Sequence, residues 1–292
     1  MGMFEGALTA LVTPFRDDHL DEKALRAIVA EQVEGGIDGL VPAGTTGESA
    51  SLSHDEYARL LEIVISEARG RVPVIAGAGA ASTAHAIELA KLAQKLKADA
   101  VLNVVPYYYR PSQEGLYAHY AALARAVSLP IVLYNIPIRT GVDLSFTTLE
   151  RLAEFSSIVA VKESTGNVLR AAEILARLGD RFHVLSGDDS LTLPLMAVGG
   201  HGVISVAANV APREISRQVD LFRAGDLAGS RKQHQRLLPL YEALFVESNP
   251  GPVKAALALR GLITGDLRLP FVPPAEASQQ RVRKALIEVG VL

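Results

Sequence analysis

The sequence contains no cysteine, although it has 292 residues. Disulfide bonds and thiolate chemistry are excluded, because both need a cysteine side chain. The seven histidines show neither the HxH nor the HExxH spacing that is typical of zinc sites. The chain also lacks the G-x-G-x-x-G fingerprint of dinucleotide-binding folds and the G-x-x-x-x-G-K pattern of phosphate-binding loops. We therefore predict no metal site and no nucleotide-binding loop.

The net charge is small, at −3, and acidic and basic residues are mixed along the chain. This balance argues against nucleic acid or an anionic membrane as the main partner. No uninterrupted apolar run reaches the length that spans a membrane. The first residues lack a basic region and include Glu5, so no signal peptide is predicted. We expect a soluble, cytoplasmic protein.

Apolar residues make up 49% of the chain and charged residues only 21%, so a sizeable hydrophobic core is expected. Eight short apolar runs recur along the sequence, and most of them are continuous rather than alternating. They begin at residues 6, 39, 72, 100, 130, 158, 182 and 201. Continuous runs are typical of parallel strands that are covered on both faces.

Segments with helical spacing separate these runs, and one of them begins with Ser53 followed three residues later by Glu56, the pattern of a capping box. A strand–helix unit repeated eight times predicts an α/β fold, a closed (β/α)8 TIM barrel. An open, doubly wound sheet is the alternative, which the missing dinucleotide fingerprint disfavours. Only helical patterns follow from about residue 212. We place the catalytic barrel in residues 1–225 and a C-terminal α-helical extension in residues 226–292.

The run IVAVKES, residues 158–164, ends its apolar part in Lys162. Lysine is strongly hydrated and is rarely buried without a partner, so a lysine that directly follows an apolar run requires an explanation. One interpretation is that a low-dielectric interior favours the neutral amine, which attacks a ketone and forms a Schiff base. The alternative is a strand-end lysine whose ammonium group reaches water.

Other predicted strand ends carry groups that suit the same chemistry. Tyr134 closes the neighbouring run, and its phenol could relay protons to an amine or could be an ordinary core tyrosine. The segment GTTGES, residues 44–49, either cradles a carboxylate with N–H and hydroxyl groups or is an ordinary turn. Arg139 either binds a carboxylate through its planar fork or is a solvated loop arginine.

Asp188 and Asp189 are the remaining candidates for metal binding. They could hold magnesium, but they could equally cap the next helix. Without a metal to polarise a carbonyl group, an aldol-type reaction must use an amine, which favours the catalytic interpretation of Lys162.

Several long motifs in a fixed order make the chain resemble the dihydrodipicolinate synthase family, within the N-acetylneuraminate lyase superfamily of Schiff-base barrels. The motifs, which cover nearly the whole chain, are GALTALVTPF, GTTGES, PYYYRPSQEGLY, LYNIPIRTG, VKESTGN, LSGDDSLTLPLMAVGGHGVISVAANV, LFVESNPGPVKAAL and LRLPFVP. The resemblance implies a lyase that condenses pyruvate with L-aspartate 4-semialdehyde in the diaminopimelate route to lysine. It also implies a reaction without a cofactor and a homotetramer built as a dimer of dimers.

The resemblance implies catalytic roles for four residues. Lys162 would form the imine with pyruvate. The hydroxyl groups of Tyr134, Thr45 and Tyr108 would relay protons, and Tyr108 would come from a neighbouring subunit.

The resemblance also implies binding roles. Thr45 and Thr46 would hold the pyruvate carboxylate, and Arg139 would bind the carboxylate of the semialdehyde. The backbone of Gly187 and Ile204 would line the pocket near the lysine. Relatives that cleave sialic acid or keto-deoxy sugar acids usually lack the arginine, so a lyase of that kind is the second choice. A barrel that binds a small acid without catalysis is the third.

Relatives that are inhibited by L-lysine hold it with an asparagine and a glutamate, and many have a histidine nearby. The matching positions of this chain are Ala81, His85 and Tyr57. Other positions of the same site remain compatible with lysine: Ser49, Ala50, His54 and Tyr107. The missing glutamate removes a charged contact with the lysine ammonium that is worth about 1.5–3 kcal/mol. We predict weak or absent inhibition by L-lysine.

Overall fold

The computed structural model describes residues 2–292. Eight strands form one parallel sheet in the order β4-β1-β10-β9-β8-β7-β6-β5. They are β1 (Gly6–Ala10), β4 (Gly39–Val41), β5 (Ile75–Gly77), β6 (Ala100–Val104), β7 (Ile131–Asn135), β8 (Ile158–Glu163), β9 (His183–Ser186) and β10 (Gly202–Ser205). A parallel bridge between Leu40 and Val74 joins the two ends of this order. The sheet therefore closes into a barrel, as the eight apolar runs predicted.

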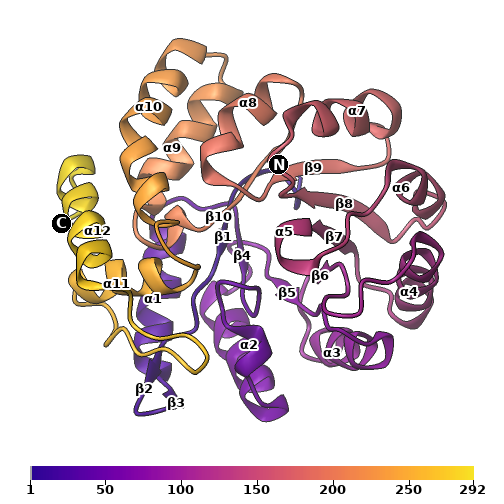
Figure 1. Cartoon of the computed structure of the whole chain (residues 1–292), viewed down its shortest axis with the longest axis horizontal. Helices are drawn as coiled ribbons and strands as arrows, with labels where there is room; N and C mark the ends of the chain where they lie inside the picture. The colour runs from indigo at the N-terminus through magenta and orange to yellow at the C-terminus, as the bar shows by residue number, and fades with distance from the viewer. Residues whose placement is uncertain (1) are drawn as a thin grey trace.

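Helices surround the strands on the outside of the barrel (Figure 1). Those that follow the strands are α1 (Glu22–Glu34), α2 (His54–Ala68), α3 (Thr83–Lys95), α4 (Gln113–Ala126), α6 (Phe146–Leu152), α7 (Val168–Leu178), α8 (Thr192–Ala197) and α9 (Pro212–Arg223). A small antiparallel hairpin of β2 (Phe15–Arg16) and β3 (His19–Leu20) lies between β1 and α1. Both faces of the barrel strands are covered, which explains why their sequences are continuously apolar.

The start of α2 shows how the local sequence determines a helix boundary. The Ser53 hydroxyl accepts a hydrogen bond from the Glu56 N–H at 3.2 Å, and the Glu56 carboxylate accepts one from the Ser53 N–H at 2.9 Å. This reciprocal pair satisfies two backbone donors that would otherwise lack partners. The predicted capping box is confirmed.

The segment after β7 differs from our expectation of a loop. Residues Pro137–Thr140 form a short helix, α5, with proline in its first turn. Proline suits that position because its fixed φ matches the helix and it has no N–H to leave unpaired. Gly141 ends the helix with a φ of 73°, a conformation that favours glycine. This turn of helix places Arg139 above the end of the strand.

The last part of the chain is helical, as predicted. It contains α10 (Leu227–Ala243), α11 (Gly251–Leu259) and α12 (Glu276–Val289), which lie beside α1 and α9 (Figure 1). The carboxylate of Asp226 caps α10 by accepting a hydrogen bond from the Gly229 N–H at 2.9 Å. The Tyr241 hydroxyl of α10 donates to the Gln218 side chain of α9 at 2.7 Å. That the chain divides into two domains at residue 226 stays a prediction.

Within residues 2–292, no helix combines the length and the apolar character that a membrane crossing requires.

Candidate active site

Lys162 and Tyr134 lie side by side at the carboxyl ends of two neighbouring strands. The two residues are register partners in the pairing of β7 with β8. Lys162 is only 5% exposed, and its Nζ lies 4.1 Å from the centroid of the Tyr134 ring. The predicted meeting of amine and phenol is confirmed, since equal register places both side chains on the same face of the sheet.

Gly187 leaves room for the lysine side chain. A Cβ atom at this position would lie 2.9 Å from Lys162 Cε and 1.8 Å from Ser164 Oγ. Both distances are shorter than real side-chain contacts, so only glycine fits here without a shift of its neighbours. Gly187 directly follows β9, and its N–H donates to the Glu163 carbonyl oxygen at 2.9 Å. Ile204 lies fully buried on the next strand, β10.

The GTTGES segment forms a tight turn after β4. The Gly47 N–H donates to the Gly44 carbonyl oxygen at 3.1 Å, and Glu48 has a left-handed φ of 53°. Thr46 is buried, and its Oγ1 accepts a hydrogen bond from the Asn249 side chain at 2.9 Å. The Thr46 hydroxyl proton stays free to donate, because a hydroxyl group can accept and donate at the same time.

A cavity of about 340 Å³ lies over the carboxyl ends of the strands. Thr45, Tyr107 and Arg139 line it, together with the segment from Arg268 to Phe271. The Arg139 guanidinium donates to the Asn249 carbonyl oxygen at 3.1 Å. The structure therefore brings Thr45 and Arg139 to one cavity, whereas Thr46 is not among its described lining residues. Among the described residues, Lys162 and Tyr134 are not part of its lining, and both are almost completely buried.

Asn249 connects two of the predicted binding residues, and the sequence analysis missed it. Its side-chain amide holds Thr46, and its backbone carbonyl holds Arg139. Its Oδ1 is buried without a hydrogen-bond partner among the described residues. The only sequence signal was its place in the motif LFVESNPGPVKAAL, which carries no local indication of a contact with GTTGES.

A buried ion pair between α11 and Glu48 supports the GTTGES turn. Lys254 Nζ lies 2.5 Å from Glu48 Oε1, and both side chains are at most 1% exposed. Burial lowers the pKa of Lys254, while the Glu48 carboxylate acts in the opposite direction. The second oxygen of Glu48 accepts from the Arg268 N–H at 3.1 Å. The sequence analysis read the segment of Lys254 only as helical, so its burial was missed.

Tyr108 lies outside both the Lys162 pocket and the cavity of its own chain. It is 83% exposed and has a left-handed φ of 75°. Its ring packs edge-on against Tyr109, with 5.3 Å between ring centroids. Within one chain, the structure therefore does not bring Tyr108 to Tyr134.

Asp188 and Asp189 bind protein groups rather than forming a metal cluster. Asp188 caps a 3-10 turn by accepting from the Ser190 N–H at 3.0 Å. The Asp189 carboxylate accepts from the Ser205 hydroxyl and from the N–H groups of Val206 and Ala207. Burial raises the pKa of Asp189 to about 6. No group of three or more candidate ligands is present among the described residues.

The predicted effector residues lie around a second cavity, of about 270 Å³. Six of the seven line it: Ser49, Ala50, His54, Tyr57, His85 and Tyr107. Ala81 is not among the lining residues that the structure describes. The Tyr57 hydroxyl is buried without a partner among the described residues, and burial raises its pKa. The His85 ring is more than half exposed and lies 3.3 Å from Glu88.

Comparison with known proteins agrees with this geometry. The model of the dihydrodipicolinate synthetase family matches residues 3–289. A 4-hydroxy-tetrahydrodipicolinate synthase of Pelobacter propionicus is 52% identical over 290 residues, which are 99% of this chain and 100% of that protein. One of Syntrophus aciditrophicus is 51% identical with the same coverage.

Solved structures give the same result. A dihydrodipicolinate synthase of Acinetobacter baumannii in complex with pyruvate is 44% identical, with a TM-score of 0.97 over 99% of this chain and 100% of that one. A homologue from Cyanidioschyzon merolae with bound lysine is 43% identical, with a TM-score of 0.97 over 100% of both chains. The chain therefore belongs to the dihydrodipicolinate synthetase family.

Proposed function

We propose that this chain is a 4-hydroxy-tetrahydrodipicolinate synthase that condenses pyruvate with L-aspartate 4-semialdehyde. Relatives with that name match it along their whole length at about half identity. The single structural observation that carries the proposal is the buried Lys162 amine, 4.1 Å from the centroid of the Tyr134 ring. A keto acid needs such an amine for Schiff-base chemistry, and the phenol of the neighbouring Tyr134 is the candidate for moving protons.

The reaction starts at Lys162. Its neutral amine attacks the keto carbon of pyruvate, and loss of water gives an iminium ion. The iminium withdraws electrons from the adjacent methyl group, which loses a proton and leaves an enamine. The enamine carbon attacks the aldehyde carbon of the semialdehyde and forms the new carbon–carbon bond. The amino group of the second substrate then attacks the imine carbon, closes the ring and releases Lys162.

Protons move through hydroxyl groups in this scheme. Tyr134 is adjacent to the amine and exchanges protons with the carbinolamine and the enamine. Thr45, which lines the cavity over the strand ends, is the next hydroxyl group in this relay. Tyr108 completes the relay from a neighbouring subunit, and its 83% exposure in one chain supports a role at an interface.

The carboxylates of the two substrates need separate partners. Thr45 and Thr46 hold the pyruvate carboxylate, because the Thr46 hydroxyl still has a proton to donate. Arg139 binds the carboxylate of the semialdehyde at the cavity. Gly187 and Ile204 line the pocket around the lysine, where glycine leaves the necessary space.

Borohydride reduction in the presence of pyruvate tests this proposal. The expected result is a stable adduct that peptide mass spectrometry maps to Lys162, and its absence in Lys162→Met. With the semialdehyde as second substrate, Arg139→Ala is expected to raise its KM while leaving adduct formation intact. An adduct at another lysine, or none, would overturn the proposal. Turnover of sialic acid or a keto-deoxy sugar acid in place of the semialdehyde would identify a related lyase.

A further inference from the structure

We propose that Glu163 is a positioning residue, which aligns Lys162 with Tyr134 through a polar cluster at the ends of β7 and β8. The strand-end cluster consists of Glu163, Asn135, Asp143 and Arg170. The inference rests on the proposed function in one respect only, since that function assigns Lys162 and Tyr134 their chemical roles.

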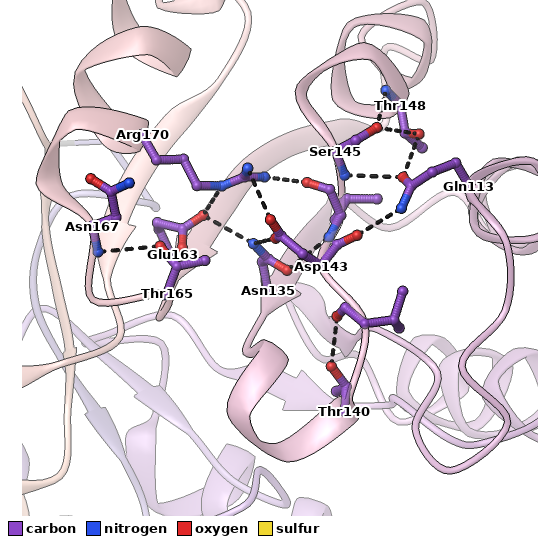
Figure 2. Close-up of polar contacts among 12 residues, drawn as sticks. Gln113, Asn135, Thr140, Asp143, Ser145, Thr148, Glu163, Thr165, Asn167 and Arg170 are labelled. Carbon is purple, nitrogen blue, oxygen red and sulfur yellow. Dashed lines mark hydrogen bonds and ion pairs between the residues drawn. The ribbon is translucent and has the colours of Figure 1, made fainter.

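Glu163 is the centre of the cluster (Figure 2). Its side chain is 2% exposed, and one carboxylate oxygen accepts from Arg170 Nε at 2.9 Å and from the Asn135 amide at 3.3 Å. Its other oxygen accepts from the Thr165 N–H at 2.7 Å. A carboxylate with three donors is held in one orientation, because charge-assisted hydrogen bonds are strong and directional.

Asn135 and Arg170 extend the cluster to the chain after β7. The Asn135 amide also donates to Asp143 at 2.7 Å, and its oxygen accepts from the Leu144 N–H at 3.1 Å. Arg170 donates to the Leu144 carbonyl oxygen and lies 3.4 Å from the Asp143 carboxylate. Both strand ends and this segment are therefore tied to one another by side chains (Figure 2).

The cluster acts on the two reacting side chains through the strands. Asn135 directly follows Tyr134, and Glu163 directly follows Lys162, and each pair of neighbours shares the same register. Successive side chains of a strand point to opposite faces. The amine and the phenol therefore lie on one face of β7 and β8, while the cluster locks both strand ends from the other face.

Further hydrogen bonds connect the strand-end cluster to the start of α4. Gln113, at the start of α4, donates to the Asp143 carbonyl oxygen at 2.8 Å and accepts from the Ser145 N–H at 3.0 Å (Figure 2). Tyr107 and Tyr108 lie just before this helix. The network thus joins the strand ends that hold Lys162 and Tyr134 to the start of α4.

A polar cluster is well suited to this task because apolar packing tolerates small shifts. Buried charges do little for stability in comparison with a well-packed apolar group, but their hydrogen bonds specify one geometry. In a site built for covalent catalysis, a displacement of about 1 Å is enough to lower turnover about 100-fold.

The test compares Glu163→Gln with Glu31→Gln. Glu31 is paired with Arg260 at 2.7 Å, but it lies near the end of α1, at the rim where the strands begin. Two measurements are made on folded protein, with circular dichroism to confirm the fold. The first is the pH-dependent rate at which acetic anhydride modifies Lys162, relative to the exposed Lys91, by peptide mass spectrometry. The second is steady-state kinetics.

We expect Glu163→Gln to lower the modification rate of Lys162, relative to Lys91, and to shift its pH profile. We expect kcat to fall about 10- to 100-fold with little change in the KM for pyruvate, because the threonines proposed to hold its carboxylate lie in the turn after β4, outside the strand-end cluster. Glu31→Gln is expected to leave both readouts within about twofold of the unmodified chain.

Unchanged Lys162 reactivity and kcat in folded Glu163→Gln would overturn the inference, because a merely structural role moves the melting temperature alone. If the unmodified chain forms no pyruvate adduct, the proposed function is overturned. A change in Lys162 reactivity in Glu163→Gln would then still support the positioning role. If Glu163→Gln does not fold, Asp143→Asn takes its place, since Asp143 is 50% exposed. It is expected to change the same readouts in the same direction.

Discussion

Two lysines are buried in the described part of the chain, and their surroundings separate a reactive amine from a structural one. Lys254 has a carboxylate 2.5 Å from its Nζ and forms a buried ion pair with it. Lys162 has the ring of Tyr134 beside it instead. The sequence singled out Lys162 at the end of a continuous apolar run, whereas Lys254 lies in a segment with a helical pattern.

The space at Gly187 gives a sharp prediction for one methyl group. In Gly187→Ala the new Cβ meets Lys162 Cε at 2.9 Å and Ser164 Oγ at 1.8 Å, so the lysine must move. We expect the pyruvate adduct to form at least about 100-fold more slowly, as measured by borohydride trapping over time.

The double variant Gly187→Ala/Ser164→Ala distinguishes crowding of the lysine from general damage. Removing the serine hydroxyl relieves the shorter contact and leaves the contact with the lysine. We expect Gly187→Ala to lower the melting temperature and the double variant to restore most of it. Adduct formation is expected to stay slow in both variants. Adduct formation at the original rate in either variant would contradict this interpretation of Gly187.

The second cavity lacks the charge that a lysine effector needs. Its described lining includes histidines and tyrosines but no aspartate or glutamate. We predict that millimolar L-lysine leaves the activity unchanged. In Ala81→Asn/His85→Glu, the added carboxylate supplies about 1.5–3 kcal/mol of binding, so inhibition is expected to appear. Initial rates measured at increasing L-lysine concentration test both the unmodified chain and the double variant. Strong inhibition of the unmodified chain would show that another group binds the ammonium.

The GTTGES turn depends on α11 for its shape. Glu48 occupies a left-handed conformation that costs backbone energy, and the ion pair with Lys254 compensates by holding it in place. Asn249, just before the same helix, holds Thr46. The C-terminal helices therefore support the turn that carries the proposed pyruvate-binding threonines.

This dependence predicts a large loss of stability in Lys254→Met. The variant leaves Glu48 buried without its counter-charge, which costs about 3–5 kcal/mol of unfolding free energy. Urea unfolding followed by circular dichroism measures the loss. In Lys254→Met/Glu48→Gln no unpaired charge remains, so most of the stability is expected to return. The exposed control Lys91→Met should change the unfolding free energy by no more than about 0.5 kcal/mol. An equal loss in the single and double variants would show that packing, not charge, is responsible.

Large exposed apolar and aromatic side chains gather near the cavity on the surface of the molecule. Four large apolar or aromatic side chains in or near the cavity are mostly exposed: Tyr108, Tyr109, Ile138 and Leu269, at 83%, 72%, 89% and 79%. Exposed clusters of this kind are typical of protein interfaces. We propose that they belong to an interface in a homotetramer, which sedimentation velocity can test directly.

Subunit complementation tests whether Tyr108 crosses that interface. Tyr108→Phe and Lys162→Met are each expected to lose activity. If the two chains are refolded together, a mixed pair has one site with both an intact Lys162 and an intact Tyr108. Random pairing of equal amounts then restores about a quarter of the original sites, because half of the pairs are mixed and one of their two sites works. No restored activity in mixed assemblies would place Tyr108 in the site of its own chain.

Much of this protein was determined by local sequence. The eight apolar runs predicted the barrel strands, since continuous burial on both faces leaves a local pattern. The capping box at Ser53 determined where α2 begins, because its partners lie three residues apart. The position of Lys162 at the end of a run made it the first candidate for catalysis.

Other features depended on closure of the barrel. Asn249 contacts Thr46, and Lys254 contacts Glu48, across separations of 203 and 206 residues. The strand-end cluster likewise joins β7, β8 and the start of α7. No periodicity encodes such pairs, because each residue looks ordinary in its own segment, and only the closed sheet brings the ends of distant strands together. The chain's order of residues thus decided the elements and the reactive lysine, and the tertiary structure decided which side chains hold that lysine in place.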